Sequence, residues 1–343
     1  MPKTTKSADA APPARIKNII ELAKLAGVSP GTVSRALTGK GTLSEKTRAK
    51  VVELARQHGF RLNQMASRLR TQRTGVVGVV FPLGHARHQH ISDPFFMTML
   101  GALADQLTES GYDLMLSRVV PGDGEWLDRI VDSGMLDGTI VIGQSDQVDT
   151  IERVAQRYAP MVVWGKVGFG HCTVGTDNAA GGQMAAEHLI GQGRRRLAFL
   201  GDVRGPEIAD RLAGARRAAE QAADVTLEAF EVSLSQDDMQ APIAGFVHRH
   251  GGEIDGIFAA TDLIATTTMR TLREAGRRVP EDVAVVGYDD LPLAAQADPP
   301  LTTVSQNVVQ GAQALVRALL GRIEGAEAPS HVIVPELVVR GSA

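Results

Sequence analysis

The hydrophobic residues near the amino end recur at helical spacing in three short segments. The first segment begins at Asn18, which forms the pattern of a capping box with Glu21, and it ends at Gly27. The second begins at Ser29 and has Pro30 at its first helical position, where a missing N–H costs nothing. Two short helices joined by a tight turn are therefore predicted here.

A third segment, from Ser44 to Gly59, completes a compact unit of three helices. Its first two helices have the pattern of a helix-turn-helix, in which the second helix enters the DNA major groove. That helix carries Thr32, Ser34 and Arg35. A guanidinium suits a bidentate contact with guanine, and short hydroxyls reach phosphates or base edges. We therefore predict that DNA is a partner of the chain; an ordinary small helical bundle is the alternative.

From Gly75 onward the pattern changes to buried strands that alternate with amphipathic helices. The pattern occurs twice, from about residue 75 to 143 and from 194 to 262, and the Asp-Gly pair at Asp137 has a counterpart at Asp255. This order predicts an α/β fold of two similar Rossmann-like lobes with doubly wound parallel sheets. A ligand would bind between the lobes, beyond the carboxyl ends of the strands.

Charge divides the chain at the same place as the hydrophobic pattern. Residues 1–73 contain 15 Lys and Arg against 4 Asp and Glu, whereas the other 270 residues contain 21 against 35. The net charge of −3 for the whole chain therefore conceals a basic head on an acidic body. This distribution is expected when only the head meets phosphates.

Composition excludes several other classes of protein. No apolar run is long enough to span a membrane and the amino end lacks a signal-peptide pattern, so a cytoplasmic protein is expected. The single Cys172 excludes an internal disulfide framework. His85, His88 and His90 can be read as a metal cluster, but they lack cysteine or paired acids. No phosphate loop, zinc-protease or nucleophile-elbow motif occurs, so we expect neither an enzyme nor a cofactor or metal.

The run from Ile16 to Val80 resembles the lactose repressor (LacI) family of bacterial transcription regulators from end to end. Further motifs continue the likeness in order: DPFF at 93–96, DNAAGG at 177–182, DRLAGAR at 210–216, AATD at 259–262, VVGYDD at 285–290 and PPLTTVSQ at 299–306. Each later motif is weak alone, but their order and spacing are specific. The resemblance implies a dimeric repressor with a periplasmic-binding-protein-like core that responds to a small molecule, usually a carbohydrate.

The resemblance also assigns a role to the segment after the three helices. In the family a hinge helix folds in the DNA minor groove and inserts a leucine between base pairs; the matching residue is Leu69, with Asn63, Ala66 and Arg68 around it. This helix would be shorter than the roughly 12 to 15 residues that an isolated helix needs in water. We therefore expect it to fold only when DNA is bound. An apolar wedge of this kind bends the duplex. A plain linker is the alternative.

Eight residues are predicted to bind the ligand, because they follow strands and match the family's motifs. They are Asp93, Phe95, Phe96, Asp177, Arg211, Asp262, Asp289 and Gln306. Carboxylates and guanidinium suit a ligand rich in hydroxyls, and an aromatic ring can lie against a sugar face. Helix capping is an alternative role for Asp177 and Asp262, and a cap or an interlobe salt bridge for Arg211 and Asp289. Trp164 is equally a stacking residue or a core residue.

Three departures from the family's pattern limit which of its residue roles can be assigned to this sequence. Pro30 and Gly31 supply no polar side chain at the start of the second helix, so DNA readout depends on Asn18, Ser29, Thr32, Ser34, Arg35, the hinge and DNA shape. Asn307 follows Gln306 where relatives often carry an acid. No leucine heptad follows the last strand, so we expect a dimer, and therefore a pseudo-palindromic operator.

The predicted organisation has four parts. They are a disordered tail (1–14), a helix-turn-helix domain (15–62), a hinge helix with linker (63–74) and a bilobal core (75–340), the core being divided into lobe 1 (about 75–175 plus 306–330) and lobe 2 (about 176–305 plus the C-terminal segment). We predict a DNA-binding transcriptional repressor controlled by a small carbohydrate. A purine-responsive corepressor system, a sugar-binding transport protein and an enzyme on the same lobes are the rivals, in that order.

Overall fold

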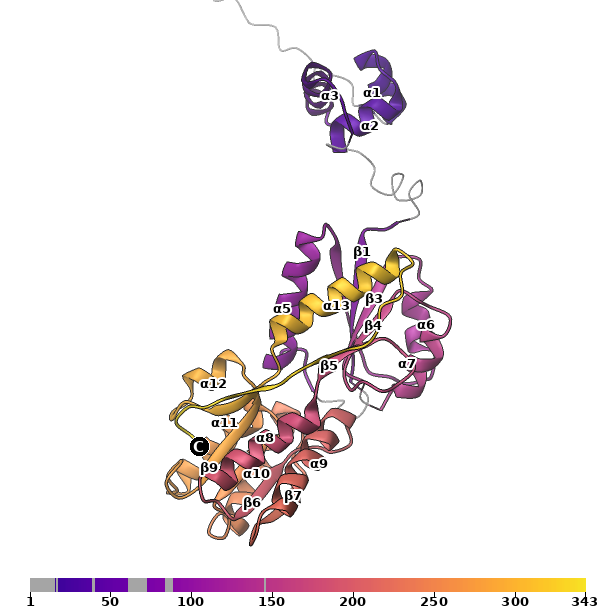
Figure 1. The fold of residues 1–343 in the computed structure, drawn as a ribbon. Coiled ribbons are helices and arrows are strands. Elements are labelled where there is room, and N and C mark those ends of the chain that lie inside the picture. The colour runs from indigo at the N-terminus through magenta and orange to yellow at the C-terminus, as the bar shows by residue number, and fades with distance from the viewer. Residues whose placement is uncertain (1–15, 17, 39–40, 61–72, 84–88, 145) are drawn as a thin grey trace, which may run out of the picture. The chain divides into compact units, whose positions relative to one another are not determined.

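The computed structural model describes two compact units, which divide between Thr74 and Gly75. The residues described are 16, 18–38, 41–60, 73–83, 89–144 and 146–343 (Figure 1). The predicted tail and the hinge residues Asn63, Ala66, Arg68 and Leu69 lie outside them, as do His85 and His88.

The amino-terminal unit is the predicted bundle of three helices. They are α1 (Ile19–Ala26), α2 (Pro30–Thr38) and α3 (Glu45–Gln57). The Asn18 side chain accepts a hydrogen bond from the Glu21 amide at 2.9 Å and donates one to its carboxylate, which completes the capping box. Gly27 ends α1 with φ of +71°, a conformation that favours glycine. Leu22, Val33 and Val51, one from each helix, are fully buried and form the core of the unit.

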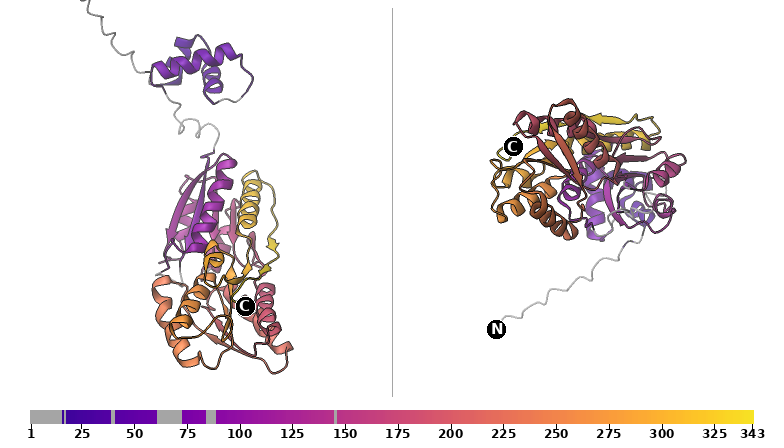
Figure 2. Two further views of the ribbon diagram at one scale, coloured as in Figure 1. Left: turned by 90° about the vertical axis from the view of Figure 1, so that its left-hand side faces the viewer. Right: turned by 90° about the horizontal axis from the view of Figure 1, so that it is seen from below.

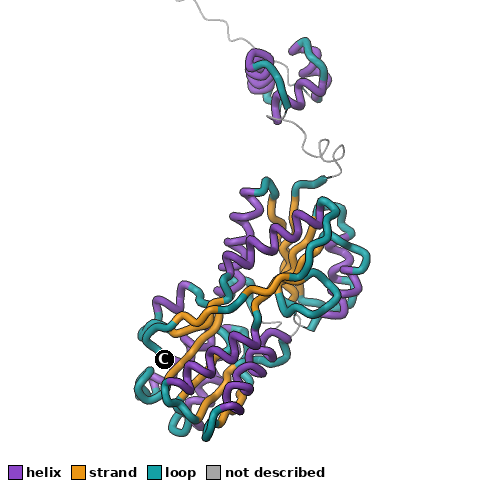
Figure 3. The backbone as a smooth tube through the Cα atoms, in the orientation of Figure 1, coloured by secondary structure: helices purple, strands orange, loops and turns teal. Residues whose placement is uncertain are grey.

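The carboxyl-terminal unit contains two six-stranded sheets, visible as two groups of strands in Figure 3. The first sheet has the order β11-β5-β4-β3-β1-β2 and the second β12-β10-β9-β8-β6-β7. Their strands are β1 (Val76–Pro82), β2 (Asp113–Val119), β3 (Gly138–Ile142), β4 (Met161–Trp164), β5 (Thr173–Thr176), β6 (Arg196–Leu200), β7 (Thr226–Phe230), β8 (Gly256–Ala259), β9 (Ala284–Asp289), β10 (Thr302–Ser305), β11 (His331–Ile333) and β12 (Glu336–Val338). Only the β10–β12 pair is antiparallel among these pairings.

Helices cover both faces of each sheet (Figure 2). They are α5 (Pro94–Glu109), α6 (Trp126–Val131), α7 (Val148–Ala155), α8 (Asn178–Gly191), α9 (Pro206–Gln221), α10 (Gln236–His250), α11 (Asp262–Glu274), α12 (Pro292–Gln296) and α13 (Val308–Ile323). In β1, Val79 packs with α5 and α13 on one face, while Val80 packs with α6 and α7 on the other. Double coverage explains why this strand reads as a continuous apolar run.

The two sheets repeat one topology. The order β2-β1-β3-β4-β5 in the first lobe corresponds to β7-β6-β8-β9-β10 in the second, and both are the 2-1-3-4-5 order of a doubly wound fold. The Asp-Gly pairs occupy equivalent places: Asp137 accepts a hydrogen bond from the Gly75 amide, and Asp255 accepts from those of Arg195 and Arg196. The predicted fold class and internal repeat are therefore confirmed.

The chain passes between the lobes three times: after β5, after β10 and between β11 and β12. The last passage differs from the expected lobe division, which placed the C-terminal segment in lobe 2. β11 instead extends the first sheet, with His331 opposite Val174, and only β12 joins the second sheet. Pro335, which lacks an N–H for a sheet ladder, separates the two short strands.

Over the part of the chain that the structure describes, no helix is both long and apolar enough to cross a bilayer.

Candidate ligand cleft and DNA-reading helices

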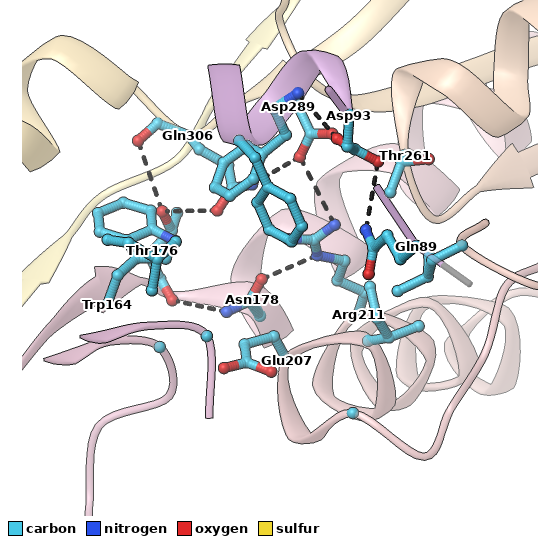
Figure 4. Close-up of a pocket in the computed structure, with 18 of the residues that line it drawn as sticks. Gln89, Asp93, Trp164, Thr176, Asn178, Glu207, Arg211, Thr261, Asp289 and Gln306 are labelled. Atoms are coloured by element: carbon cyan, nitrogen blue, oxygen red, sulfur yellow. Dashed lines mark hydrogen bonds and ion pairs between the residues drawn. The ribbon is translucent and has the colours of Figure 1, made fainter. Parts of the chain in front are cut away.

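A cavity of about 120 Å³ lies between the two lobes, at the carboxyl ends of both sheets. β1, β3, β4 and β5 end at its first-lobe side, and β9 ends at its second-lobe side (Figure 4). Its described lining consists of Pro82, Leu83, Gln89, Asp93, Phe95, Phe96, Ile142, Gly143, Trp164, Gly165, Thr176, Asn178, Gly205, Glu207, Ile208, Arg211, Leu234, Thr261, Asp289 and Gln306. This position is where open α/β sheets bind ligands.

The first lobe contributes an aromatic wall. The ring centroids of Phe95 and Phe96 lie 6.0 Å apart, and those of Phe95 and Trp164 lie 6.4 Å apart. Asp93 fixes the start of α5, because its carboxylate accepts a hydrogen bond from the Phe95 amide at 2.9 Å. Gln89 also donates to Asp93, at 3.2 Å, and burial raises the pKa of the Asp93 carboxyl. The wall suits the apolar face of a flat ligand.

The second lobe contributes Arg211, whose side chain is 4% exposed. Its Nε donates to the Asn178 side-chain oxygen at 2.9 Å, and its Nη1 donates to the Ala260 carbonyl at 2.5 Å. The guanidinium carbon lies 3.7 Å from the centre of the Tyr288 ring, within reach of a cation–π interaction. Asp289 is the nearest carboxylate, with its Oδ1 3.8 Å from Nη1. Arg211 is therefore held in a single orientation before any ligand arrives.

Two glycines explain how Arg211 reaches Asn178. A Cβ on Gly182 of α8 would lie 1.9 Å from the Arg211 carbonyl oxygen, and one on Gly214 of α9 would lie 1.9 Å from that of Ala179. The backbones of α8 and α9 therefore touch at these positions, which only glycine permits. This contact brings the first residue of α8 against the first turns of α9.

Asp289 ends β9 and points into the cavity. It has φ of +120° and Asp290 has φ of +56°, unusual values for residues with side chains. The Asp289 Oδ1 accepts a hydrogen bond from the side-chain amide of Gln306 at 2.6 Å, and Asp290 forms an ion pair with Arg340 at 2.6 Å. Burial raises the pKa of Asp289 to about 7, against the opposing effect of Arg211. Its proton occupancy therefore responds to pH near neutrality.

Gln306 connects this group to the passage between the lobes. It follows β10, is buried, and its Oε1 accepts a hydrogen bond from the Thr176 hydroxyl at 3.4 Å. Asn178 in turn donates to the Thr176 carbonyl at 3.0 Å. The polar groups of the cleft thus form one chain of hydrogen bonds across two of the three passages (Figure 4).

One ion pair and one His–Asp contact join the lobes beside the cavity. Lys166, next to the lining residue Gly165, pairs with Asp210 of α9 at 2.9 Å, and the Lys166 amide is held by Gln144 at 3.0 Å. His90 lies 3.1 Å from Asp237 of α10. These pairs tie the lobes in the arrangement seen here.

Six of the eight predicted ligand residues line one cavity: Asp93, Phe95, Phe96, Arg211, Asp289 and Gln306. Trp164 both lines the cavity and is buried, at 5% exposure.

The other two predictions require correction. Asp177 is exposed outside the lining, and its carboxylate caps α8 by accepting from the Ala180 amide at 2.9 Å. Asp262 is fully buried outside the lining, where it accepts from the Thr303 hydroxyl at 2.5 Å and the Leu291 amide at 2.8 Å. Burial and the neighbouring Asp289 raise its pKa. The capping role left open for Asp177 matches the structure, whereas Asp262 is the first residue of α11 and does not cap it.

The lining residues are instead their sequence neighbours. Asn178 follows Asp177, and Thr261 precedes Asp262 and caps α11 by accepting from the Ile264 amide. Sequence alone locates the strand end to within a residue or so, and a shift of one residue there turns the side chain to another side.

Glu207 is a lining residue that the sequence analysis missed. It lies in the first turn of α9, and its Oε1 is buried without a hydrogen-bond partner among the described residues. A Cβ on Gly165 of the other lobe would lie 2.8 Å from this oxygen. Burial raises the pKa of the Glu207 carboxyl. An acid in the first turn of a helix is ordinary, so the sequence held no specific signal for this role.

In the amino-terminal unit, α2 presents Arg35 on an exposed surface, with its Nε 3.3 Å from the Gly31 carbonyl oxygen. Ser29 caps this helix: its hydroxyl accepts from the Thr32 amide at 3.1 Å and lies 2.9 Å from the Thr32 hydroxyl. Ser34 differs from the prediction, because it is 9% exposed and packs within the unit. Little of its surface is left for DNA.

Within the described ranges, no group of three or more His, Cys, Asp or Glu side chains is placed to hold a metal ion.

Comparison with known proteins places both units in known classes. Residues 18–63 match the model "Bacterial regulatory proteins, lacI family", and residues 186–343 match "Periplasmic binding protein-like domain". The HTH-type transcriptional regulator MalR of Streptomyces coelicolor is 31% identical, over 94% of this chain and 96% of its own length. The HTH-type transcriptional regulator CelR of Thermobifida fusca is 32% identical over the same shares.

The solved structure of a CelR–cellobiose complex shares 30% sequence identity with this chain and superposes with a TM-score of 0.68, covering 96% of this chain and all of that one. Relatives of this kind are DNA-binding transcriptional regulators and not enzymes. With its helix-turn-helix unit, its two-lobed core and relatives above 30% identity along nearly its whole length, the chain belongs to the lacI family of bacterial regulatory proteins.

Proposed function

We propose that this protein is a homodimeric transcriptional repressor of the cytoplasm, whose affinity for operator DNA is controlled by a small carbohydrate bound between the two core lobes. One observation carries the proposal: an aromatic wall from one lobe faces a preorganised group of hydrogen-bonding side chains from the other across the cavity. Sugars present apolar ring faces and many hydroxyls, so they match both walls.

The relatives support a carbohydrate over other metabolites. The solved CelR structure is a complex with cellobiose, and CelR matches 94% of this chain. In this chain Phe95, Phe96 and Trp164 would lie against the sugar ring, while Arg211, Asp289 and Gln306 would bind its hydroxyls. Asp93 would both cap α5 and accept a hydroxyl proton.

The DNA contact falls to α2 and to the segment beyond the three helices. Arg35 is the exposed residue of α2 suited to guanine, with Asn18, Ser29 and Thr32 near phosphates and Ser34 reduced to a minor contact. Asn63, Ala66, Arg68 and Leu69 remain predicted contacts of a hinge helix in the minor groove. A homodimer would read two half-sites of a pseudo-palindrome.

Control requires only that the carbohydrate prefer one arrangement of the lobes, because a ligand with equal affinity for both arrangements shifts nothing. A ligand that touches both walls has this preference, since opening the cleft removes one set of contacts. A coupling free energy of about 1 to 3 kcal/mol would change operator affinity roughly 5- to 150-fold.

The test uses the full chain. An operator is selected in vitro from random palindromic DNA, and calorimetry then screens cellobiose, maltose, sucrose, ribose and the purine bases. We expect a carbohydrate to bind and to change operator affinity in fluorescence anisotropy. Binding of a purine base alone would replace the proposal with a purine-responsive regulator.

Arg35→Ala should weaken operator binding by about 1 to 3 kcal/mol and reduce the sequence specificity at one base position. Sugar binding should stay unchanged.

A further inference from the structure

The described walls of the cleft hold more acid than base. Four of the described lining residues carry ionisable side chains, and three of them are carboxylic acids: Asp93, Glu207 and Asp289, against the single cation Arg211. A cleft that binds a phosphate or carboxylate group would need an excess of cationic side chains and free N–H groups instead.

The cations near the cavity are also already engaged. Arg211 donates to Asn178 and to a carbonyl oxygen and stacks on Tyr288. Lys166, beside the lining residue Gly165, gives its ammonium to Asp210. An anionic ligand would therefore meet only the remaining N–H groups of Arg211 while it approached three carboxylic acids.

Glu207 has the contacts least explained by the fold. An acid at the start of a helix is favourable, but such an acid normally keeps its oxygens in water or on a backbone amide. Backbone N–H groups of Glu207, Lys166 and Gln144 act on this carboxyl. Its Oε1, however, is buried without a hydrogen-bond partner among the described residues, and no dashed line reaches it in Figure 4. A buried acceptor without a donor is costly. The cavity that Glu207 lines is where a donor can arrive.

We propose that Glu207 is a specificity-determining residue of the cleft: it accepts a hydrogen bond from a hydroxyl of the bound carbohydrate and excludes carbohydrates that carry phosphate or carboxylate. This inference rests on the proposed function and narrows it to uncharged sugars. The start of α9, from its capping residue Gly205 to Glu207, is the part of the second lobe that faces Gly165 across the cleft.

The experiment compares Glu207→Gln with Glu220→Gln in the full chain. Glu220 lies on the same helix but is exposed, outside the cavity lining, so its variant is the matched control for charge. Calorimetry measures cellobiose, maltose, glucose and ribose, and then glucuronate, glucose 6-phosphate and ribose 5-phosphate. The glutamine variant keeps the size of the side chain, and circular dichroism confirms that each variant is folded.

We expect at least one uncharged sugar to bind the natural chain and the Glu220→Gln variant equally, and to bind Glu207→Gln about tenfold more weakly, since one of the two acceptor oxygens is replaced by an NH2 group that cannot accept. The anionic counterparts should bind the natural chain at least tenfold more weakly than the uncharged sugar, and this gap should narrow in Glu207→Gln.

Deoxy analogues of the uncharged sugar that binds then locate the contact. The analogue that lacks the hydroxyl bound by Glu207 should lose affinity for the natural chain but not for Glu207→Gln. A uniform loss with every deoxy analogue in both proteins would contradict a direct contact.

The failure of this inference and that of the proposed function are distinguishable. If glucuronate or a sugar phosphate binds as tightly as its uncharged counterpart, or if Glu207→Gln behaves like Glu220→Gln, the role of Glu207 is wrong while sugar control stands. If none of these carbohydrates binds, the proposed function itself is wrong.

Discussion

The two lobes share one topology but supply opposite chemistry to the cleft. The first lobe gives Phe95, Phe96 and Trp164, and the second gives Glu207, Arg211 and most of the buried hydrogen bonds. The equivalent strand β9 ends in Asp289 where β4 ends in Trp164. Duplicating a fold therefore fixes where a ligand binds, while the residues at each strand end decide what kind of surface it meets.

The lobes also differ in how their site residues are supported. The aromatic wall lies on a hydrophobic cluster with α5 and α13 and needs only packing. Arg211 instead depends on backbone contact between α8 and α9, a buried acid and a ring beneath it. We therefore expect substitutions in the second lobe to cost stability as well as binding, and substitutions in the aromatic wall to cost mainly binding.

Removal of Arg211 should have the largest effect. Arg211→Ala leaves the buried Asp289 without its counter-ion and the Asn178 and Ala260 oxygens without their donor. At pH 8, where Asp289 is mostly charged, we therefore expect a loss of about 3 to 5 kcal/mol in the free energy of unfolding, together with loss of the sugar response. Urea unfolding followed by circular dichroism measures the first quantity. The double variant with Asp289→Asn should recover part of the stability but not the sugar response.

The matched comparison in the first lobe is Phe95→Ala, which should weaken sugar binding with a smaller loss of stability because Phe95 is only partly buried. Equal stability losses for Phe95→Ala and Arg211→Ala would contradict the contrast between the lobes.

The contact between α8 and α9 should have the next largest effect. Gly214→Ala places a methyl group 1.9 Å from the Ala179 carbonyl oxygen, so the helices must separate; we expect a loss of about 1 to 3 kcal/mol in unfolding free energy and a displaced Arg211. Gly191→Ala is the control, because nothing lies within 4 Å of its added Cβ at the end of α8. Similar stabilities for the two variants would exclude a tight helix contact.

Much of this architecture is readable from the sequence because its causes are local or periodic. Apolar runs predict strands that are covered on both faces, and Asn18, Ser29 and Ser44 predict helix starts that the structure shows as caps. The repeated Asp137 and Asp255 predict the duplication, and each accepts a hydrogen bond from the amide of the residue that precedes the first strand of its lobe.

The misses follow from what sequence cannot specify. Which of two adjacent residues faces the cavity depends on the twist at the end of a strand. The sequence therefore predicts Asp177 as the ligand residue, whereas its neighbour Asn178 lines the cleft. Glu207 enters the site only because the other lobe brings Gly165 beside it, a contact between segments distant in sequence. β11 joins the first sheet through three residues, too short a segment for a pattern to assign.

Protonation of Asp289 predicts a pH dependence specific to the second lobe. Burial raises the pKa of Asp289 to about 7, while Arg211 lowers this pKa and Asp93 raises it. A sugar hydroxyl that donates to the carboxylate stabilises the charged form and lowers the pKa, so binding releases a proton. Sugar affinity should therefore increase as the pH rises from 6 to 8 and level off above it, by about tenfold for each unit by which the pKa falls.

Calorimetry in buffers of different ionisation enthalpy measures the released proton directly. Asp289→Asn should flatten the profile, whereas Phe95→Ala should shift the affinity at every pH by the same factor. Affinity that falls as the pH rises, or a profile unchanged by Asp289→Asn, would show that Asp289 does not bind the sugar as a carboxylate.

The smallest effect is expected where the lobes touch outside the cavity. Lys166 and Asp210 form a partly exposed pair at 2.9 Å, and such pairs contribute about 0 to 1 kcal/mol. Because the pair exists only when the lobes approach, Lys166→Met should weaken sugar binding by no more than about fivefold. It should do so without changing the pH profile, since neither residue touches Asp289 in the cavity.

A double-mutant cycle with Asp210→Asn isolates the pair: the second substitution should have little further effect once the first is present. His90→Gln tests the other pair, between His90 and Asp237, in the same way. Additive losses in the first cycle would mean that Lys166 and Asp210 act separately, and that closure of the cleft depends on the ligand's contacts with the two walls alone.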